Sequence, residues 1–261
     1  MLTSSAGGDR RAESPLWDYT PLARHYESRA PYHPATLAGV LAEAAIAPGG
    51  AAVDVGAGTG RFTRALAETG FEVEAVEPCA AMRAIGEERC LGLPVRWSAA
   101  RGEATGLPDA RHRLIAFASS FNVVDSTAAL AEAARVLAPD GLLVCLWNHR
   151  DLGDPLQQAI EASVRRIVPE FRYGRRREDP THLIAESGRF HAVGHVSLAH
   201  VHLTDVETFL DGFRAHATLV RQAGARLDAV LGDVGALLAG SREVAVPFTT
   251  RVWFARRRGG P

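Results

Sequence analysis

Asp54-Val55-Gly56-Ala57-Gly58-Thr59-Gly60 is the stretch that decides the fold of this chain. It follows an apolar run at 51–53 and continues into residues 59–69, which have helical spacing. The stretch therefore predicts a buried strand that turns sharply into a helix. Three alternate glycines allow that turn and let a flat ligand lie directly against the backbone. A dinucleotide-binding fingerprint, G-x-G-x-x-G, would need its third glycine at position 61, which is Arg61. The spacing therefore speaks against a dinucleotide.

Two carboxylates near this turn indicate which ligand it suits. Asp54 stands two places before the first glycine, where it would repel a pyrophosphate and favour a ligand that carries ammonium and sulfonium groups, as S-adenosylmethionine does. A second strand, FEVEAVEP, contains Glu77 at its end, and a carboxylate there can accept hydrogen bonds from both hydroxyls of a ribose. Nicotinamide and methionine-derived cofactors share that ribose, so Glu77 indicates adenosine without choosing between them. A turn that binds nothing is the alternative.

Strand and helix patterns alternate between residues 50 and 150. Apolar strands are expected at about 93–98, 113–120 and 142–148, with helices at 79–86 and 127–137. This alternation predicts an α/β fold with a Rossmann-like, doubly wound sheet that is covered on both faces.

The flanking segments complete the predicted domain organisation. Residues 1–14 are polar and Gly/Ser-rich and are expected to be a disordered lead. The rest, 15–261, is expected to form one domain. Its expected parts are N-terminal helices at 15–47, a cofactor-binding core at 50–150, a substrate insertion at 150–190 between strands five and six, and further strands and helices at 191–256.

Composition excludes several classes of protein. Twenty-nine basic residues against thirty acidic ones give a formal net charge of −1, which argues against a protein that grips phosphate backbones. Every basic residue is Arg, so a Schiff-base lysine and a P-loop lysine are excluded. Three cysteines without C-x-x-C spacing predict neither a disulfide framework nor a Cys-rich zinc site. No apolar run suggests a signal peptide or a membrane span, so we expect a cytoplasmic protein with no membrane partner.

Taken together, these motifs resemble the class I S-adenosylmethionine-dependent methyltransferases, particularly the small-molecule group called methyltransferase type 11. The resemblance covers about residues 50–150 and rests on VDVGAGTGRFT, VEAVEP followed by CAAM, GEATGLPD and ARVLAPDGLLVCLWNHRD. It implies a seven-stranded, mostly parallel sheet, an N-terminal helical lid, S-adenosyl-L-methionine as cofactor and S-adenosyl-L-homocysteine as its product. The strand that ends in Trp-Asn implies a subgroup frequent in secondary-metabolite pathways.

The resemblance also implies a set of cofactor-binding residues. They are Asp54, Gly56, Ala57, Gly58 and Gly60 for the methionine and ribose parts; Glu77, Pro78, Met82, Gly102, Glu103 and Ala104 for the ribose hydroxyls and the adenine; Ser119 and Ser120 for the sulfonium and its methyl; and Tyr26 and Arg29 in the lid for the carboxylate. Two positions depart from the family pattern. Phe121-Asn122-Val123-Val124-Asp125 stands where many relatives carry Phe-His-Trp-Phe-Asp, and Gly102 replaces the usual alanine, which we expect to be a minor change.

Methyl transfer from a sulfonium asks mainly for geometry, because the methyl group is already activated. The protein must hold the nucleophile in line with the S–CH₃ bond and exclude water. A general base is needed only where the attacking atom must lose a proton. The catalytic candidates are His25, His149 and Asn122, each with the alternative of being an ordinary polar residue on a loop or strand end. The expected substrate contacts are Trp17, Tyr19, Tyr32, Asn148 and Tyr173.

Histidines and arginine runs favour no further site. His200 and His202 share one face of a strand, but no Glu or Cys stands at matching spacing, so we expect solvent-facing histidines and no metal site. The runs Arg175-Arg176-Arg177 and Arg256-Arg257-Arg258 are expected to be solvated charge, which disfavours nucleic acid as a partner.

The leading hypothesis is methyl transfer from S-adenosylmethionine to N, O or C of a small-molecule metabolite, in secondary metabolism. A protein of this fold that binds the cofactor without transferring its methyl group stays open because of the departure at Asn122. An NAD(P)-dependent oxidoreductase is a further alternative, against which the glycine spacing and Asp54 speak. The acceptor, the element methylated and the oligomeric state are not predicted.

Overall fold

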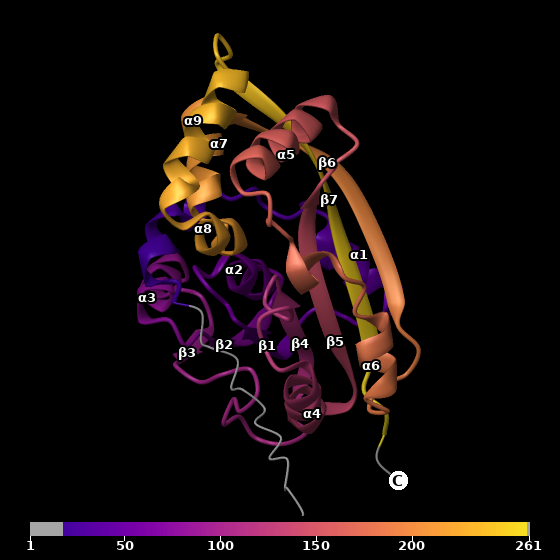
Figure 1. Ribbon diagram of the computed structural model, residues 1–261. Coiled ribbons are helices and arrows are strands. Elements are labelled where there is room, and N and C mark those ends of the chain that lie inside the picture. Colours follow the sequence, from indigo (N-terminus) through magenta and orange to yellow (C-terminus); the bar gives the residue numbers. More distant parts are fainter. Residues whose placement is uncertain (1–17, 260–261) are drawn as a thin grey trace, which may run out of the picture.

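A seven-stranded sheet forms the centre of the computed structural model, which describes residues 18–259 (Figure 1). Its strands are β1 Gly50–Val55, β2 Phe71–Val76, β3 Val95–Ser98, β4 His112–Ala118, β5 Leu137–Arg150, β6 Gly194–Asp205 and β7 Glu243–Arg256. They lie in the order β3-β2-β1-β4-β5-β7-β6, and only β7 runs antiparallel to its neighbours. The predicted doubly wound α/β fold is confirmed. The predicted lead at 1–14 and Trp17 lie outside the described residues.

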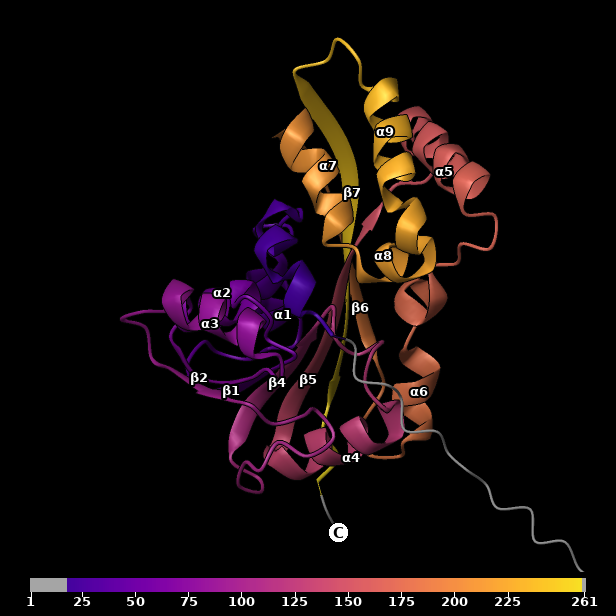
Figure 2. The same ribbon diagram turned by 60° about the vertical axis from the view of Figure 1, so that its left-hand side comes forward.

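Helices cover the two faces of the sheet (Figure 2). The helices on one face are α1 Thr36–Glu43, α2 Arg61–Glu68 and α3 Ala80–Arg89, and those on the other are α4 Ser126–Val136 and α6 Thr181–Glu186. Side chains of a strand alternate between faces. In β5, Leu142 and Val144 pack under α1 and α2, whereas Leu143 and Cys145 pack under α4. Both faces are apolar, which is why the central strands read as continuous hydrophobic runs.

A separate group of helices gathers beyond one end of the sheet, and we call it the cap (Figures 1 and 2). The cap consists of α5 Pro155–Ile167, α7 Val206–Arg214, α8 Ala217–Ala223 and α9 Leu227–Leu237. It buries a hydrophobic cluster of its own, which includes Val164 of α5, Phe213 of α7 and Val230 of α9. The predicted insertion between strands five and six supplies α5, the 3-10 turn η2 (Gly174–Arg177) and α6. The connection between β6 and β7 supplies the other cap helices.

Acidic N-caps fix where several helices begin. Asp125, Asp154 and Asp205 each accept a backbone N–H three residues on, at 2.9, 3.0 and 2.8 Å. Pro155 follows its cap at the first position of α5, where a missing N–H costs nothing.

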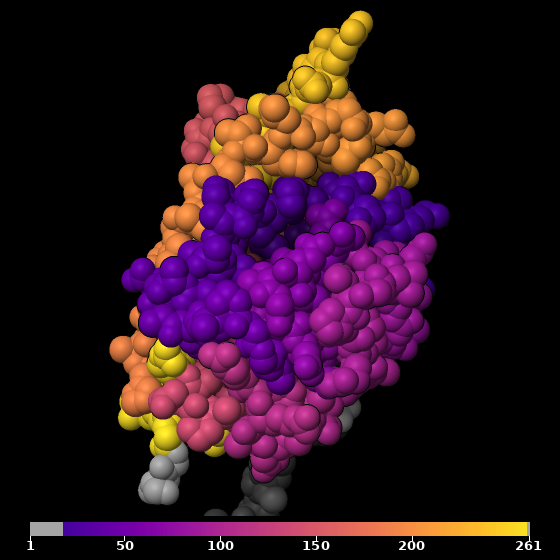
Figure 3. All heavy atoms as spheres, turned by 180° about the vertical axis from the view of Figure 1, so that it is seen from behind, coloured from indigo at the N-terminus to yellow at the C-terminus, as the bar shows by residue number. Residues whose placement is uncertain are grey.

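The N-terminal lid begins with the helix η1 (Thr20–Ser28), which is a 3-10 helix and lies within the segment predicted to be helical. η1 packs against α7 of the cap and α3 of the core. Figure 3 shows this indigo segment between the orange cap region and the purple core. The lid thus bridges the two parts of the molecule. No helix among residues 18–259 is both long and apolar enough to cross a membrane.

Two expectations about surface residues are wrong. His200 and His202 lie half-buried on the inner side of β6, and Val201 and Leu203 of that strand face solvent instead, at 61% and 65% exposure. The second arginine run, Arg256-Arg257-Arg258, is not a free tail. Its guanidinium groups donate to backbone carbonyls at the end of the sheet, for example from Arg256 to Asp140 at 2.9 Å.

Candidate functional site

The glycine turn between β1 and α2 has the backbone that its sequence predicts. Gly56, Gly58 and Gly60 all have left-handed φ, at +67°, +57° and +77°. A Cβ added at Gly56 would lie 2.5 Å from the Cβ of Ser120, so the turn and the end of β4 meet with no room for a side chain. Gly60 serves a different purpose from the predicted cradle. An added Cβ there would lie 3.1 Å from the Cα of Gly86, so Gly60 permits the close approach of α2 and α3.

Glu77, at the end of β2, holds the turn in place. Its Oε2 accepts the backbone N–H of Gly58 at 2.8 Å, and its Oε1 accepts that of Cys79 at 2.8 Å. Burial raises the pKa of Glu77, and these two N–H donors act in the opposite direction. Each carboxylate oxygen keeps a further acceptor position, so Glu77 can still receive two hydroxyl donors.

Asp54 does not line the cavity beside this turn, contrary to the expected contact with a ligand's amino group. It shares a face of β1 with Ala52, which packs toward α2, so its carboxylate lies behind the turn. There its Oδ2 accepts the hydroxyl of Thr63 at 2.7 Å, and its Oδ1 is buried without a partner among the described residues. Burial raises the pKa of Asp54 to about 7.

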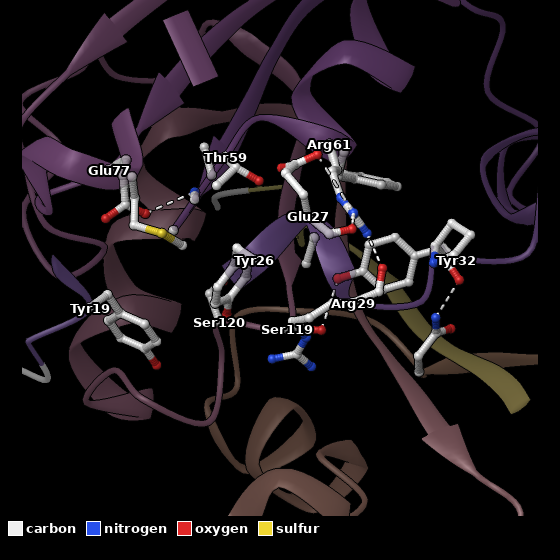
Figure 4. A pocket seen from close by; sticks show the side chains of 18 of the residues that line it. Tyr19, Tyr26, Glu27, Arg29, Tyr32, Thr59, Arg61, Glu77, Ser119 and Ser120 are labelled. Carbon is white, nitrogen blue, oxygen red and sulfur yellow. Dashed lines mark hydrogen bonds and ion pairs between the residues drawn. The ribbon is translucent and has the colours of Figure 1, made fainter. Parts of the chain in front are cut away.

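A large cavity of about 930 Å³ opens above the turn, at the carboxyl edge of the parallel strands (Figure 4). Twelve of the predicted cofactor residues line it: Tyr26, Arg29, Gly56, Ala57, Gly58, Glu77, Pro78, Met82, Gly102, Glu103, Ser119 and Ser120. Asp54, Gly60 and Ala104 do not; Ala104 is exposed and bridges to Arg101. Gly102 is more than a minor change from alanine, because an added Cβ would lie 2.7 Å from Cγ1 of Val55.

The lid closes over the large cavity through hydrogen bonds to the sheet. The Tyr32 hydroxyl lies 2.8 Å from Oγ of Ser119, at the end of β4. Burial raises the pKa of Tyr32 to about 12, so this hydroxyl stays protonated. Asn148, a predicted substrate residue, lines the cavity but uses its amide structurally: Nδ2 donates to Ala30 O at 3.3 Å, and Oδ1 accepts from Thr250 at 2.5 Å.

An ion-pair network that the sequence did not reveal fastens the other end of the lid (Figure 4). The carboxylate of Glu27 pairs with Arg89 of α3 and with Arg61 of α2, the latter at 3.7 Å. Arg61 also donates to two lid carbonyls, and Arg89 donates to Thr59 O at 2.8 Å. These residues are 28 to 62 positions apart in the chain (Arg61 to Arg89, Glu27 to Arg89), so local spacing carries no sign of them.

All three catalytic candidates lie outside the large cavity, and His25 and Asn122 are taken up by other partners. Nδ1 of His25 lies 2.6 Å from Asp211 of α7, and its Nε2 accepts from Arg24 at 2.9 Å. Both ring nitrogens therefore serve the contact between lid and cap. Oδ1 of Asn122 accepts the indole N–H of Trp147 at 3.0 Å. Neither side chain is placed to receive a proton from a molecule in the cavity.

His149 lines a second, smaller cavity of about 100 Å³ under the cap. Its Nε2 lies 3.0 Å from the carbonyl of Arg176, so that nitrogen carries the proton and donates it. Burial lowers the pKa of His149 to about 4, which makes it a weak base. The predicted substrate residue Tyr173 also lines this small cavity rather than the large one, and its hydroxyl donates to Glu161. Tyr19 and Tyr32, by contrast, line the large cavity.

The first arginine run corrects another expectation. Only Arg175 of the three is exposed; Arg176 and Arg177 are half-buried and line the small cavity. η2 turns them inward because His149 holds the carbonyl of Arg176 from below. Within the described part of the chain, no three His, Cys, Asp or Glu side chains are grouped so that they could hold a metal ion.

The core of this chain is similar to known methyltransferases. A family model described as a methyltransferase domain matches residues 53–145. The ubiquinone/menaquinone biosynthesis C-methyltransferase UbiE of Caulobacter vibrioides is 31% identical over 137 residues, which are 47% of this chain and 54% of that protein. An uncharacterized methyltransferase of Mycobacterium tuberculosis is 38% identical over 101 residues, 38% of this chain and 40% of its own. The chain thus spans about half the length of the curated relatives it matches.

Solved structures share the fold over most of the chain. The YcgJ protein of Bacillus subtilis has a TM-score of 0.57 at 16% identity, and the match covers 87% of this chain and all of that one. Phosphoethanolamine N-methyltransferase 2 of Haemonchus contortus, solved with phosphomonomethylethanolamine and S-adenosylhomocysteine, has a TM-score of 0.51 at 13% identity, covering 85% of this chain and 52% of that one. At these identities the likeness shows the fold.

Proposed function

We propose, from the premise that this chain belongs to the class I S-adenosylmethionine-dependent methyltransferases, that it transfers a methyl group from S-adenosylmethionine to a small molecule in the large cavity. The observation that carries the proposal is the glycine turn after β1, fixed by Glu77 and open to that cavity. Ligands of open α/β sheets bind at this edge. A volume of about 930 Å³ lies at the upper end for small-molecule sites, so it has room for a cofactor and an acceptor.

The residues of the cavity fit this cofactor. Glu77 has two free acceptor positions for the ribose hydroxyls, and Met82 offers a flexible apolar side chain to the adenine. Arg29, stacked on the ring of Tyr26 at 5.1 Å, offers a cation to the methionine carboxylate. Asp54 acts from behind the turn, where its buried carboxylate favours positive charge in the cavity.

The chain's own contribution to the chemistry is positioning and the exclusion of water. When bound, the cofactor supplies a methyl group on a sulfonium that any well-placed nucleophile can attack. The lid covers part of the cavity, and the paired hydroxyls of Tyr32 and Ser119 in its wall remain neutral. His25 and Asn122 are engaged elsewhere, and His149 lies outside the large cavity, so an acceptor should arrive already nucleophilic, as an amine or as an ionised oxygen or carbon.

The finer parts of the proposal come from the relatives and the sequence. The Caulobacter vibrioides protein is named for C-methylation in quinone biosynthesis, which supports a small-molecule acceptor here. A role in secondary metabolism and a cytoplasmic location stay predictions of the sequence. A cofactor-binding protein without methyl transfer is the second candidate, and we keep it because none of the three predicted catalytic residues lines the large cavity.

Calorimetry with S-adenosylmethionine and S-adenosylhomocysteine tests the cofactor site. We expect micromolar binding of both and none of NADH, which would also dispose of the oxidoreductase alternative. Absence of heat with either nucleoside would refute the proposal. Incubation with methyl-labelled cofactor and a metabolite extract then separates the two candidates, because label transfer excludes the non-transferring protein.

A further inference from the structure

Four guanidinium groups surround the small cavity under the cap. They belong to Arg29 of the lid, Arg150 at the end of β5, and Arg176 and Arg177 of η2. Among the described residues that line this cavity there is no Asp or Glu, and none of the four arginines forms an ion pair within residues 18–259. The cavity is therefore a concentration of positive charge in a chain whose net charge is −1.

Neutral groups satisfy three of these arginines in part. Arg150 donates to Gln157 at 3.1 Å and stacks on Phe213 at 5.1 Å. Arg177 donates to the carbonyl of Arg150 at 3.2 Å and stacks on Tyr173. Arg29 makes one long contact of 3.5 Å to a carbonyl besides its stacking on a tyrosine. Each keeps N–H donors for which the structure gives no acceptor among residues 18–259.

Arg176 differs from the other three. Its guanidinium has no hydrogen bond or ion pair with any residue that the structure describes, although it is partly buried. Burial and, to a smaller extent, the nearby cation of Arg29 lower the pKa of Arg176 to about 10. A partly buried cation that has no charged partner and lies near a like charge is unfavourable unless a further group offsets it.

His216, at the start of α8, adds another donor to the same wall. Its Nδ1 accepts the N–H of Leu219 at 3.1 Å, so the neutral ring carries its proton on Nε2. Burial and the cations of Arg176, Arg29 and Arg150 hold the pKa of His216 well below its usual range. The cations of Arg29, Arg150 and Arg176 thus act on one neutral imidazole. The arginines and Nε2 of His216 supply donors to this wall, which also contains Nδ1 of His149, a buried acceptor with no partner among the described residues.

The small cavity adjoins the site of the proposed reaction. Ser28, Arg29 and Ala30 line both cavities, so a molecule in the large cavity can extend a group into the small one. The cofactor's own carboxylate can use Arg29, which still leaves three arginines. A volume of about 100 Å³ matches a group of a few heavy atoms, since a water molecule takes roughly 30 Å³.

We propose that the small cavity binds an oxyanion of the methyl acceptor, a carboxylate or a phosphate, with Arg176 as its principal partner. The acceptor is then an anionic small molecule that places its charged end under the cap and its nucleophilic atom beside Ser119. Phe209, Phe213 and Phe248 in the same wall suit an apolar or aromatic portion next to the charge. The identification of this ligand as the acceptor rests on the proposed function; the anion site itself does not.

The test is calorimetry with benzoate, phenyl phosphate and the neutral analogue benzamide, with and without saturating S-adenosylhomocysteine. We expect both anions to bind and benzamide not to, and the tighter anion identifies the acceptor's charged group. Arg176→Gln should weaken anion binding at least tenfold, because it removes charge-assisted hydrogen bonds. Arg175→Gln is the matched control: Arg175 lies on the same turn, exposed and 3.7 Å from Glu178. It should leave anion binding unchanged.

Each outcome separates this inference from the proposed function. If S-adenosylhomocysteine binds and neither anion does, or if benzamide binds as well as benzoate, the anion site is refuted while the cofactor site stands. If S-adenosylhomocysteine does not bind but the anions bind to the wild-type protein and not to Arg176→Gln, the cofactor site is refuted while the anion site stands. The melting temperature of Arg176→Gln is a further readout: relief of repulsion predicts no fall, whereas a structural role predicts a lower value.

Discussion

Replacing Asp54 by Asn should change how stability depends on pH. Asp54 is fully buried, and burial raises its pKa from 3.8 to about 7. Between those values the folded state binds a proton that the unfolded state has released, so this group's contribution to stability falls as pH rises through that window. One pKa unit corresponds to about 1.36 kcal/mol. Between pH 5.5 and 7.5 the wild-type protein should therefore lose about 2 kcal/mol relative to Asp54→Asn.

Urea unfolding of both proteins at the two pH values measures this difference. The comparison between proteins cancels the titration of all other groups. Asp228→Asn, at an exposed carboxylate in the first turn of α9, is the control, and its difference from wild type should stay constant over this range. If the wild-type and Asp54→Asn stabilities run parallel from pH 5.5 to 7.5, the buried carboxylate does not carry the penalty that its orphaned Oδ1 implies.

Three further substitutions test the turn, the cavity wall and the lid. Glu77→Ala leaves the two N–H groups that Glu77 accepts without a partner, so we expect the free energy of unfolding in urea to fall by roughly 2–4 kcal/mol. S-adenosylhomocysteine should bind at least tenfold more weakly; an unchanged affinity would contradict a role of Glu77 in cofactor binding. Gly102→Ala should cost about 1–3 kcal/mol by overpacking, whereas Gly39→Ala, in open space on α1, should gain up to about 1 kcal/mol, as thermal melts would show. Glu27→Gln should raise the KM for the cofactor several-fold and speed hydrogen exchange across η1, while costing about 1 kcal/mol or less in stability; exchange as slow as in wild type would exclude the tether.

Local chemistry made the core predictable. The turn after β1 could be predicted because its glycines permit the left-handed backbone that the turn needs. The role of Glu77 could be predicted from its position at the end of β2. Even where local chemistry set the expectation, packing decided the details. Gly102 must be a glycine because of Val55, and Gly60 combines its left-handed φ with a close approach to Gly86; no pattern around them reveals these two contacts.

Contacts between distant segments were not predictable. His25 looked like a catalytic candidate because it sits in the lid, but its partner Asp211 is 186 residues away. Arg176 looked like one of three solvated charges, since a run of like charges is usually exposed. Its inward orientation depends on His149, 27 residues earlier, and on a cap assembled from two separate connections. Sequence spacing shows which residues are neighbours within one helix or strand. It does not show which residues from distant segments the fold places against them.

Residues 28–30 form part of the wall of both cavities, so entry to the two cavities is coupled. A single movement of residues 28–30 would open both cavities at once. S-adenosylhomocysteine and the methylated product could then leave by the same opening. Asn148 and Arg61 hold this segment by hydrogen bonds to its carbonyls. The rate of turnover would therefore depend on how often these hydrogen bonds break.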